Sequence, residues 1–549
     1  MNSVFFLSNE QWESIRSSGN FDYIVIGSGF CGFAFVERIL SSNRGARILM
    51  IERGPFLLPE HIQNLAAPFA SVLGGVSETF PWTLSAQTAK QPQGHLQWQS
   101  GMFPFVGGRS TVWSAWCPRP TRSEMAHWPE QTICAAESHF ESAEKLLGVI
   151  HANKIAERTI AAGSHDIGNR PIYGLMQQQL QDMLANDLHK IDNATRSMAA
   201  PLAICAGIDR GIGFAKFSVP GVLLGLAQQQ ARLGNPMRIA TECVAKQILQ
   251  IEGVAREIDT SRGIVRIENA KVVLAMGTIP TTTLLLNSFP ELKEKAGTRF
   301  SGHFITSVIA RVPRSDFTFG SDIANLELGT IYIAGKNKSN DAQFHIQLSV
   351  LSDRSPSTNE GILARHVPDM LATPSLAQRT SSEDHIVFSC TALGELDFRN
   401  RKNSLSQNAD YDLTTNVTLQ FSCNETDKAT WSTMDEAIFQ MMERIFSFQG
   451  RIEYWCGDRD SGGWRQTRPS ELQRRLPGLV HDGSTLWIGE TDESVVRSDY
   501  RPWGVENVFV TGGALWPAGG SWNPTLVMTA LAQDLADRFL PRKDQREAI

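Results

Sequence analysis

A glycine-rich turn near the amino terminus has a spacing that predicts a chemical role. Gly27-Ser-Gly29-Phe30-Cys31-Gly32 fits the pattern GxGxxG, follows the apolar run Tyr23–Ile26 and precedes a segment with helical spacing. In such a turn the first glycine permits a tight bend, the second lets the backbone approach a pyrophosphate, and the third allows close helix–strand packing. Free N–H groups at the helix start favour phosphate. The turn therefore predicts a dinucleotide site.

The next buried run supplies an acidic residue at the expected place. Glu52 ends the run 47–52 and lies 20 positions after Gly32. We expect its carboxylate to accept hydrogen bonds from the adenosine ribose, which disfavours a 2′-phosphate. The alternative is a glycine turn in an ordinary α/β protein, and the fingerprint alone does not separate NAD from FAD.

Bulk properties exclude several other classes of protein. The net charge of −6 and the pI near 6.1 argue against a nucleic-acid partner. There is neither a secretory signal nor an apolar stretch approaching the roughly 20 residues of a membrane helix. The eight cysteines form no CxxC pair, and no His/Cys/Asp cluster has metal-ligand spacing. We expect a soluble, intracellular, cytoplasmic protein with reduced thiols, no membrane partner and no metal.

The elements that must position these residues alternate between buried strands and helices. The pattern predicts helices near 137–147, 155–162, 172–188, 219–232, 433–446 and 523–538. Strands are expected at 237–240, 243–250, 263–268, 271–274, 344–350, 415–423 and 507–511. Elements typical of nucleotide binding occur at both ends and in the middle, which predicts two domains interleaved in sequence.

Three further segments narrow the prediction to one family. They are Val106-Gly107-Gly108-Arg109-Ser110-Thr111-Val112-Trp113, then Met276-Gly277-Thr278-Ile279-Pro280, and last His481-Asp-Gly-Ser followed by Gly512-Gly513-Ala514 and Asn523-Pro524-Thr525. With the fingerprint, their order over nearly the whole chain resembles the glucose–methanol–choline (GMC) oxidoreductases, FAD enzymes that oxidise alcohols. The chain is most similar to the pyranose oxidase and glycoside oxidase branch, because a His/Asn pair replaces the His/His pair of many relatives.

One position departs from that branch. The pyranose oxidases have a histidine, covalently bonded to the flavin, where this chain has Val112. Valine cannot form the bond, so we expect non-covalent FAD. The departure also weakens the case for a free pyranose as substrate.

The resemblance implies a catalytic pair. His481 would take the hydroxyl proton, since an unperturbed imidazole pKa near 6.5 suits a base at physiological pH. Asn523 would hydrogen-bond the same oxygen and orient the C–H bond toward flavin N5. Pro524 is expected in the first turn of the last helix. The residues expected to bind FAD are Gly27, Gly29, Phe30, Cys31, Gly32, Glu52, Arg53, Gly107, Gly108, Ser110, Thr111, Val112, Trp113, Val244, Ala275, Gly277, Gly513, Ala514, Asn523, Pro524 and Thr525.

For some residues, a purely structural role explains the sequence as well as a role in binding. Val244 would cover the adenine in the family, yet a strand valine fits as well. His345 and Gln347 lie two apart on one predicted strand, so both would point to one face, and the hypothesis is that this face lines the substrate cavity. The tryptophans crowded between 82 and 128 are expected to pack long loops onto a core.

The resemblance implies an α/β fold, α+β overall, with a Rossmann-like FAD-binding domain formed by 1–130, 215–300 and 478–549. A substrate-binding domain built on a mainly antiparallel sheet would take 131–214 and 301–477. The expected substrate is a small-molecule alcohol: a sugar, a glycoside or a secondary metabolite. Oxygen or another acceptor would reoxidise the flavin, and no motif indicates an oligomeric state. A non-redox lyase or decarboxylase, and a flavin-binding protein without activity, remain alternatives; the intact His481/Asn523 pair disfavours both.

Overall fold

The computed structural model describes residues 5–65, 96, 103–157, 171–205, 214–369, 372–447 and 449–541. Its first unit is the predicted strand–helix–strand arrangement. Strand β1 (Tyr23–Ile26) leads through the glycine turn into α3 (Phe30–Ser42), and β2 (Ile48–Ile51) pairs with β1 in parallel. Both strands are buried on both faces, as their apolar sequences require.

The first sheet collects parallel strands from distant parts of the chain. Its order is β23-β11-β1-β2-β7. The three further strands are β7 (Arg238–Ala240), β11 (Lys271–Leu274) and β23 (Val508–Val510). This order confirms a doubly wound α/β unit of the Rossmann type, since strands from near residues 25, 240, 275 and 510 share one sheet.

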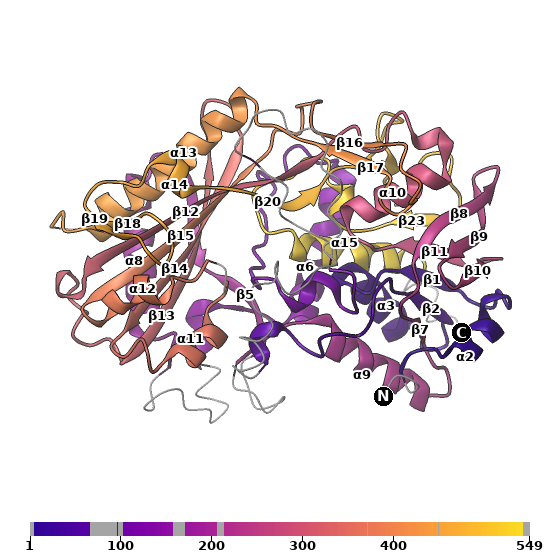
Figure 1. The fold of residues 1–549 in the computed structure, drawn as a ribbon, viewed down its shortest axis with the longest axis horizontal. Helices are drawn as coiled ribbons and strands as arrows, with labels where there is room; N and C mark the ends of the chain where they lie inside the picture. The colour runs from indigo at the N-terminus through magenta and orange to yellow at the C-terminus, as the bar shows by residue number, and fades with distance from the viewer. Residues whose placement is uncertain are drawn as a thin grey trace.

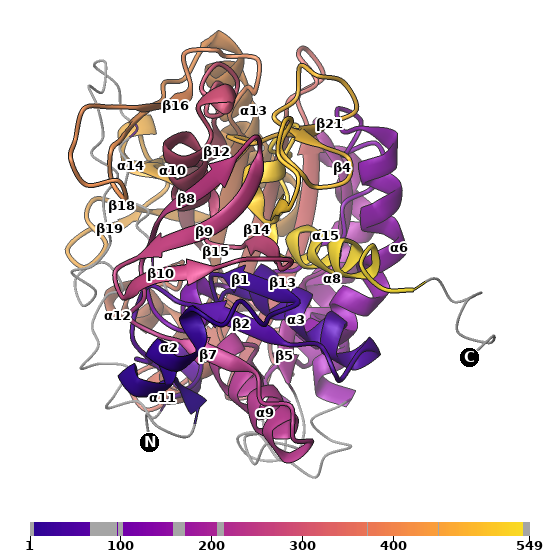
Figure 2. The same ribbon diagram turned by 90° about the vertical axis from the view of Figure 1, so that its right-hand side faces the viewer.

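Helices from both ends of the chain pack on this unit. Helix α15 (Thr525–Asp537) lies between α3 and α6 (Glu130–Leu147), as Figure 2 shows. Helices α9 (Val219–Arg232) and α10 (Thr278–Ser288) also belong to this side of the molecule (Figure 1). A small antiparallel sheet, β10-β9-β8, lies beside them; its strands are β8 (Ala245–Ile251), β9 (Val254–Thr260) and β10 (Gly263–Arg266).

The second main sheet is antiparallel and forms the other half of the molecule (Figure 1). Its order is β19-β18-β12-β15-β14-β13-β4, and β20 also pairs with β12. The strands are β4 (Ala194–Ala199), β12 (Ser301–Pro313), β13 (Leu326–Lys336), β14 (Gln343–Asp353), β15 (His385–Glu395), β18 (Glu453–Cys456), β19 (Gly463–Arg465) and β20 (Arg475–Gly483). Strand β20 lies between the two sheets (Figure 1).

The two faces of this sheet differ in burial. Along β12, residues such as Phe304 and Val308 are fully buried and face α13 (Glu425–Met441), which contacts β12, β14 and β15. The alternate residues, including Ser307, keep part of their surface exposed. The sheet therefore has one face in the core and one face accessible near its centre.

The helix predicted at 433–446 begins earlier than expected. Helix α13 starts at Glu425, because Asn424 and Asp427 form a reciprocal capping box. It ends at Met441, where a π-helical turn (Met442–Phe446) follows. The sequence analysis also did not predict β9, because the charged residues in this strand obscure the alternation of apolar and polar residues. By contrast, α9 and β11 have the predicted bounds.

The structure also bears on the expectations for the cysteines, the tryptophans and membrane-spanning helices. All eight cysteines are unpaired thiols. Trp116 and Trp128 are buried packing residues, whereas Trp82 and Trp98 lie outside the described residues. Within the described ranges, no helix combines the length and apolar character needed to cross a membrane.

Candidate active site

The predicted glycine fingerprint forms a tight turn between β1 and α3. Gly27 has φ of 102°, and a Cβ there would lie 2.4 Å from the carbonyl oxygen of Ala275. A Cβ on Gly32 would lie 2.1 Å from the carbonyl oxygen of Gly27. Gly29 is the N-cap of α3 and provides no side-chain cap, so the first N–H groups of that helix are available to an anion.

Glu52 is fixed against this turn. Its carboxylate accepts hydrogen bonds from the Ser28 hydroxyl (2.6 Å), the Ser28 backbone N–H (3.1 Å) and the Gly54 backbone N–H (3.1 Å). Burial raises its pKa, while these hydrogen bonds act in the opposite direction. The neighbouring Arg53 donates to the Thr414 hydroxyl (3.3 Å), and burial lowers its pKa.

The second motif lies directly on the first. Gly107 donates its N–H to the Ser28 hydroxyl (3.1 Å), and both Gly107 and Gly108 have positive φ. A Cβ on Gly108 would approach the Cα of Gly29 to 3.8 Å, so the two backbones face each other. Ser110 accepts a hydrogen bond from the backbone of Val219 at the start of α9. This is a cradle of bare backbone that permits a flat or charged group to approach closely.

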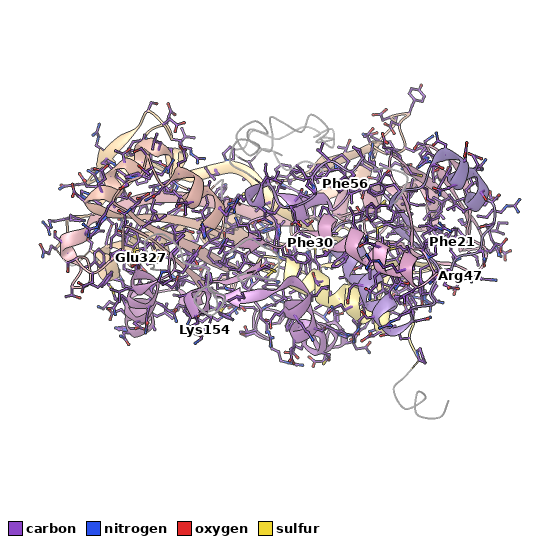
Figure 3. The ribbon with its side chains drawn as sticks, turned by 90° about the horizontal axis from the view of Figure 1, so that it is seen from below. Phe21, Phe30, Arg47, Phe56, Lys154 and Glu327 are labelled. Atoms are coloured by element: carbon purple, nitrogen blue, oxygen red, sulfur yellow. The ribbon has the colours of Figure 1, made fainter. Side chains whose placement is uncertain are left out.

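Most remaining residues expected at the cofactor surround this cradle. Phe30, labelled near the middle of the molecule in Figure 3, packs edge-on against Trp113 with ring centroids 4.7 Å apart. Thr111 donates to the carbonyl oxygen of Gly108 (3.0 Å), and Val112 packs beside Leu58 and Phe105. Cys31 is buried, which raises its thiol pKa to about 12 and makes it unreactive.

Two other glycine segments reach the same edge of the parallel sheet. Helix α10 begins after Gly277, directly beyond β11, and a Cβ on Gly277 would meet no atom within 4 Å. Ala275 and Gly277 thus follow β11 as Gly27 and Gly29 follow its parallel neighbour β1. The turn Gly513–Leu515, which includes Ala514, follows β23. Helix α15 begins at Thr525 with Pro524 as its N-cap, one position outside the helix rather than in its first turn.

Val244 is placed differently from the strand residue expected. It lies just before β8, and its backbone N–H and C=O are paired with the Ser261 hydroxyl (2.9 Å) and the Ser261 N–H (2.8 Å). Its backbone polar groups are therefore already satisfied by the protein.

These features fit FAD. Helices α3 and α10 begin at one sheet edge without side-chain caps, so their free N–H groups suit a pyrophosphate. Glu52 lies at the adjacent strand end, where a ribose is expected. At Gly29 and Gly108 a Cβ would meet no atom closer than 3.8 Å, so space remains there, whereas at Gly107 it would meet the Pro220 ring at 2.5 Å.

His481 lies in an irregular part of β20. On β12, Ser301 pairs with Gly483 and His303 pairs with Val480, so β20 has an extra residue between these pairs. His481 has φ of 61°, a conformation that is unusual for a residue other than glycine. Such a bulge redirects a side chain. Next to it, Asp482 forms an ion pair with Arg109 (2.7 Å), which ties this strand to the glycine cradle.

The structure places His481 and Asn523 in two neighbouring hydrogen-bonded groups. His481 Nδ1 lies 2.8 Å from His303 Nδ1, and His303 Nε2 lies 2.6 Å from the Gly520 carbonyl oxygen. Gln347 Nε2 donates to Asn523 Oδ1 (2.9 Å) and lies 3.1 Å from His345 Nε2. The ring centroids of His303 and His345 lie 6.5 Å apart, so the His481 group and the Asn523 group are neighbours.

Burial keeps the three histidines neutral. It lowers the pKa of His303 to about 4 and the pKa of His345 well below its usual value. The pKa of His481 is also well below 6.5, first because of burial and then because His303, His345 and Arg109 lie nearby. His481 nevertheless retains accessible surface, whereas His303 and His345 are buried. A neutral imidazole that remains accessible can act as a base.

His303 is the member of this cluster that the sequence did not indicate. It is a single polar ring in the strand 301–313, and nothing in its neighbourhood resembles a motif. His345 and Gln347 do share one face of β14, as the alternation predicted, but they contact each other and Asn523. The strand also contains Ser301, Thr306, Ser307 and Arg311, so a further polar residue in it gives no signal in the sequence.

Comparisons with known proteins show what the chain is similar to. Residues 401–532 match the family model described as GMC oxidoreductase. A C-glycoside 3-oxidase from Arthrobacter globiformis is 23% identical over 553 residues, which covers 93% of each chain. The crystal structure of pyridoxine 4-oxidase from Mesorbium loti has a similar fold, with a TM-score of 0.56 and 12% identity over 95% of this chain and 99% of that one.

Proposed function

Because this chain is a GMC oxidoreductase, an enzyme acting on CH–OH groups, we propose that it oxidises a secondary hydroxyl of a glycoside with His481 as the base. The observation that supports the proposal is that the hydrogen-bonded groups of His481 and of Asn523 are neighbours, through the rings of His303 and His345. We further propose that the parallel sheet and the antiparallel sheet belong to the two interleaved domains expected from the sequence.

The fingerprint, Glu52 and the glycine cradle would hold FAD, which when bound would supply a hydride acceptor. Val112 has an aliphatic side chain that packs beside Leu58 and Phe105, which supports non-covalent binding. Oxygen or another acceptor would then remove the electrons.

The proposed chemistry assigns complementary roles to the catalytic pair. Asn523 Oδ1 is occupied by the Gln347 amide (2.9 Å), so the Asn523 amide nitrogen is left to donate to the substrate oxygen. The hydroxyl proton passes to the neutral, accessible His481 ring. One donor and one acceptor match the hydrogen-bonding capacity of an alcohol, which orients its C–H bond.

The accessible face of the large sheet supports a polyhydroxylated substrate. Ser307, Thr391, Gln347 and Tyr332 occupy one row across β12, β15, β14 and β13. Neighbouring strands are about 4.8 Å apart, so this row presents polar groups at regular intervals. Among the described residues, the buried hydroxyl oxygens of Tyr332 and Thr391 have no hydrogen-bond partner.

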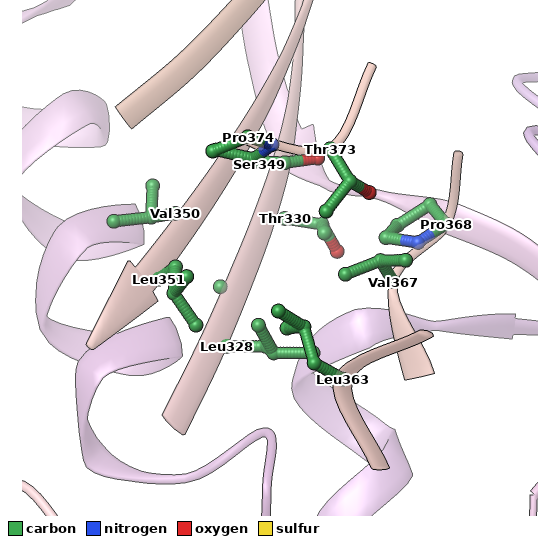
Figure 4. A pocket seen from close by; sticks show the side chains of 11 residues that line it. Leu328, Thr330, Ser349, Val350, Leu351, Leu363, Val367, Pro368, Thr373 and Pro374 are labelled. Atoms are coloured by element: carbon green, nitrogen blue, oxygen red, sulfur yellow. The ribbon is translucent and has the colours of Figure 1, made fainter. Parts of the chain in front are cut away.

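A small, mainly aliphatic pocket continues the same face. Thr330 and Ser349, cross-strand partners in the next row, line this pocket (Figure 4). Its other walls are mainly aliphatic: Leu328, Val350, Leu351, Leu363, Val367, Pro368 and Pro374. The similarity to a C-glycoside 3-oxidase supports a glycoside over a free sugar.

Anaerobic mixing of the purified, FAD-loaded protein with a panel of alcohols tests the proposal. Aryl C- and O-glycosides should bleach the visible flavin band, and the matching free sugars should do so more slowly. Substrate turnover with a persistent yellow colour would indicate a lyase instead. No bleaching by any glycoside, sugar or other secondary alcohol would refute the proposed oxidation.

A further inference from the structure

A short relay of hydrogen bonds runs from a backbone carbonyl to the proposed base. The Gly520 carbonyl oxygen lies 2.6 Å from His303 Nε2, and His303 Nδ1 lies 2.8 Å from His481 Nδ1. The two imidazole planes are inclined by 84°, with centroids 4.9 Å apart. Each ring nitrogen on this path therefore has one defined partner.

The chemistry of the partners fixes where the protons lie. A carbonyl oxygen can only accept, so His303 Nε2 must carry a proton and donate it to Gly520. A neutral imidazole carries one N–H, which leaves His303 Nδ1 as an acceptor. His481 Nδ1 must then carry the proton in the 2.8 Å bond. In neutral His481 the remaining nitrogen, Nε2, has a free lone pair.

We propose that His303 is a positioning residue that holds His481 in the tautomer whose Nε2 is unprotonated and available to the substrate hydroxyl. This inference rests on the proposed function, in which His481 is the base. It adds the requirement that His481 has a defined tautomer. In the opposite tautomer, Nε2 would carry a proton and would be a donor where the substrate hydroxyl needs an acceptor.

The surrounding backbone supports a dedicated arrangement. The bulge in β20 and the positive φ of His481 place its ring beside His303 instead of along the regular strand. Gly520 has φ of 61°, and a Cβ there would lie 2.1 Å from the Trp522 ring. Two unusual backbone conformations thus support one relay, as is common where geometry serves a function.

A spectroscopic test needs no substrate. The FAD-loaded protein is labelled with ¹⁵N-histidine, and the His481 signals are assigned by their loss in His481→Ala. We expect His481 Nδ1 to show the shift of a protonated nitrogen and Nε2 that of an unprotonated nitrogen at pH 7. The reverse pattern would overturn the inference. In His303→Leu, the two His481 signals should move toward each other as the tautomers mix.

A matched pair of variants tests the consequence for the rate. His303→Leu keeps bulk but removes the acceptor, whereas His303→Asn places an amide oxygen near the former Nδ1. We expect His303→Leu to slow flavin reduction by roughly 10- to 100-fold with little change in KM. His303→Asn should recover most of that loss. Equal rates in the two variants would overturn the positioning role. Unchanged reduction in His481→Ala would instead refute the proposed function itself.

Discussion

The buried His303 should make the folded protein less stable as the pH falls, and His303→Asn should remove that loss. The side chain is 2% exposed, and burial lowers its pKa from 6.5 to about 4. Below pH 6.5 the unfolded chain binds a proton at this ring, whereas the folded protein does so only near pH 4. The free energy of unfolding therefore decreases with pH across this window.

The size of the effect follows from the two pKa values. The window from 6.5 to about 4 spans 2.5 units, and one unit corresponds to about 1.36 kcal/mol, so His303 accounts for about 3 kcal/mol at most. At pH 5 the loss is about 2 kcal/mol, because pH 5 lies 1.5 units below 6.5. Asparagine does not titrate, so the variant lacks this contribution.

Urea titrations followed by tryptophan fluorescence at pH 7 and pH 5 measure the difference. The buried Glu395, whose pKa burial raises to about 7, acts in the opposite sense and is present in both proteins. His303 also helps to lower the pKa of His345 and His481, so the measured difference includes the response of these two rings to its loss. The exposed His189→Asn is a matched control and should keep the parent's pH dependence. If the parent and His303→Asn lose the same stability between these pH values, His303 is not a neutral buried ring and the reasoning fails.

Four other perturbations give separate checks. His481→Ala should abolish substrate-driven flavin reduction while the absorbance spectrum still shows bound FAD; reduction at the parent rate would remove His481 from the mechanism. Gln347→Leu should slow reduction by about 10-fold in stopped-flow traces, because Asn523 loses the bond that orients it. Gly32→Ala should cost about 1–3 kcal/mol in urea unfolding, since its Cβ meets a backbone oxygen at 2.1 Å, whereas Gly225→Ala in α9, with no atom within 4 Å, should stabilise by about 0.5–1 kcal/mol. Acid precipitation should leave a colourless pellet, and a yellow pellet would contradict the assignment drawn from Val112.

The sequence predicted best what depends on short stretches of chain. The unit of β1, α3 and β2 follows from an apolar run, a glycine turn and helical spacing within about 30 residues. The start of α13 was missed because a polar capping box, not an apolar residue, sets it.

The candidate site was only partly predictable, for a physical reason. His481 and Asn523 lie in recognisable segments, and the alternation of β14 predicted a shared face for His345 and Gln347. His303 contacts His481 across 178 positions, through a strand pairing whose register depends on the tertiary fold. A bulge and a left-handed backbone conformation decide which rings meet, and neither has a signature in the local sequence.

The composition of the parallel sheet has a consequence for biosynthesis. Its edge strand β23 begins at Val508, and α15, which packs on α3, begins at Thr525. During translation β11 and α3 therefore lack these apolar partners until the residues of β23 and α15 have left the ribosome. At a synthesis rate of about 5–20 residues per second, such a nascent chain exposes apolar surface for many seconds. Chaperones bind surface of this kind.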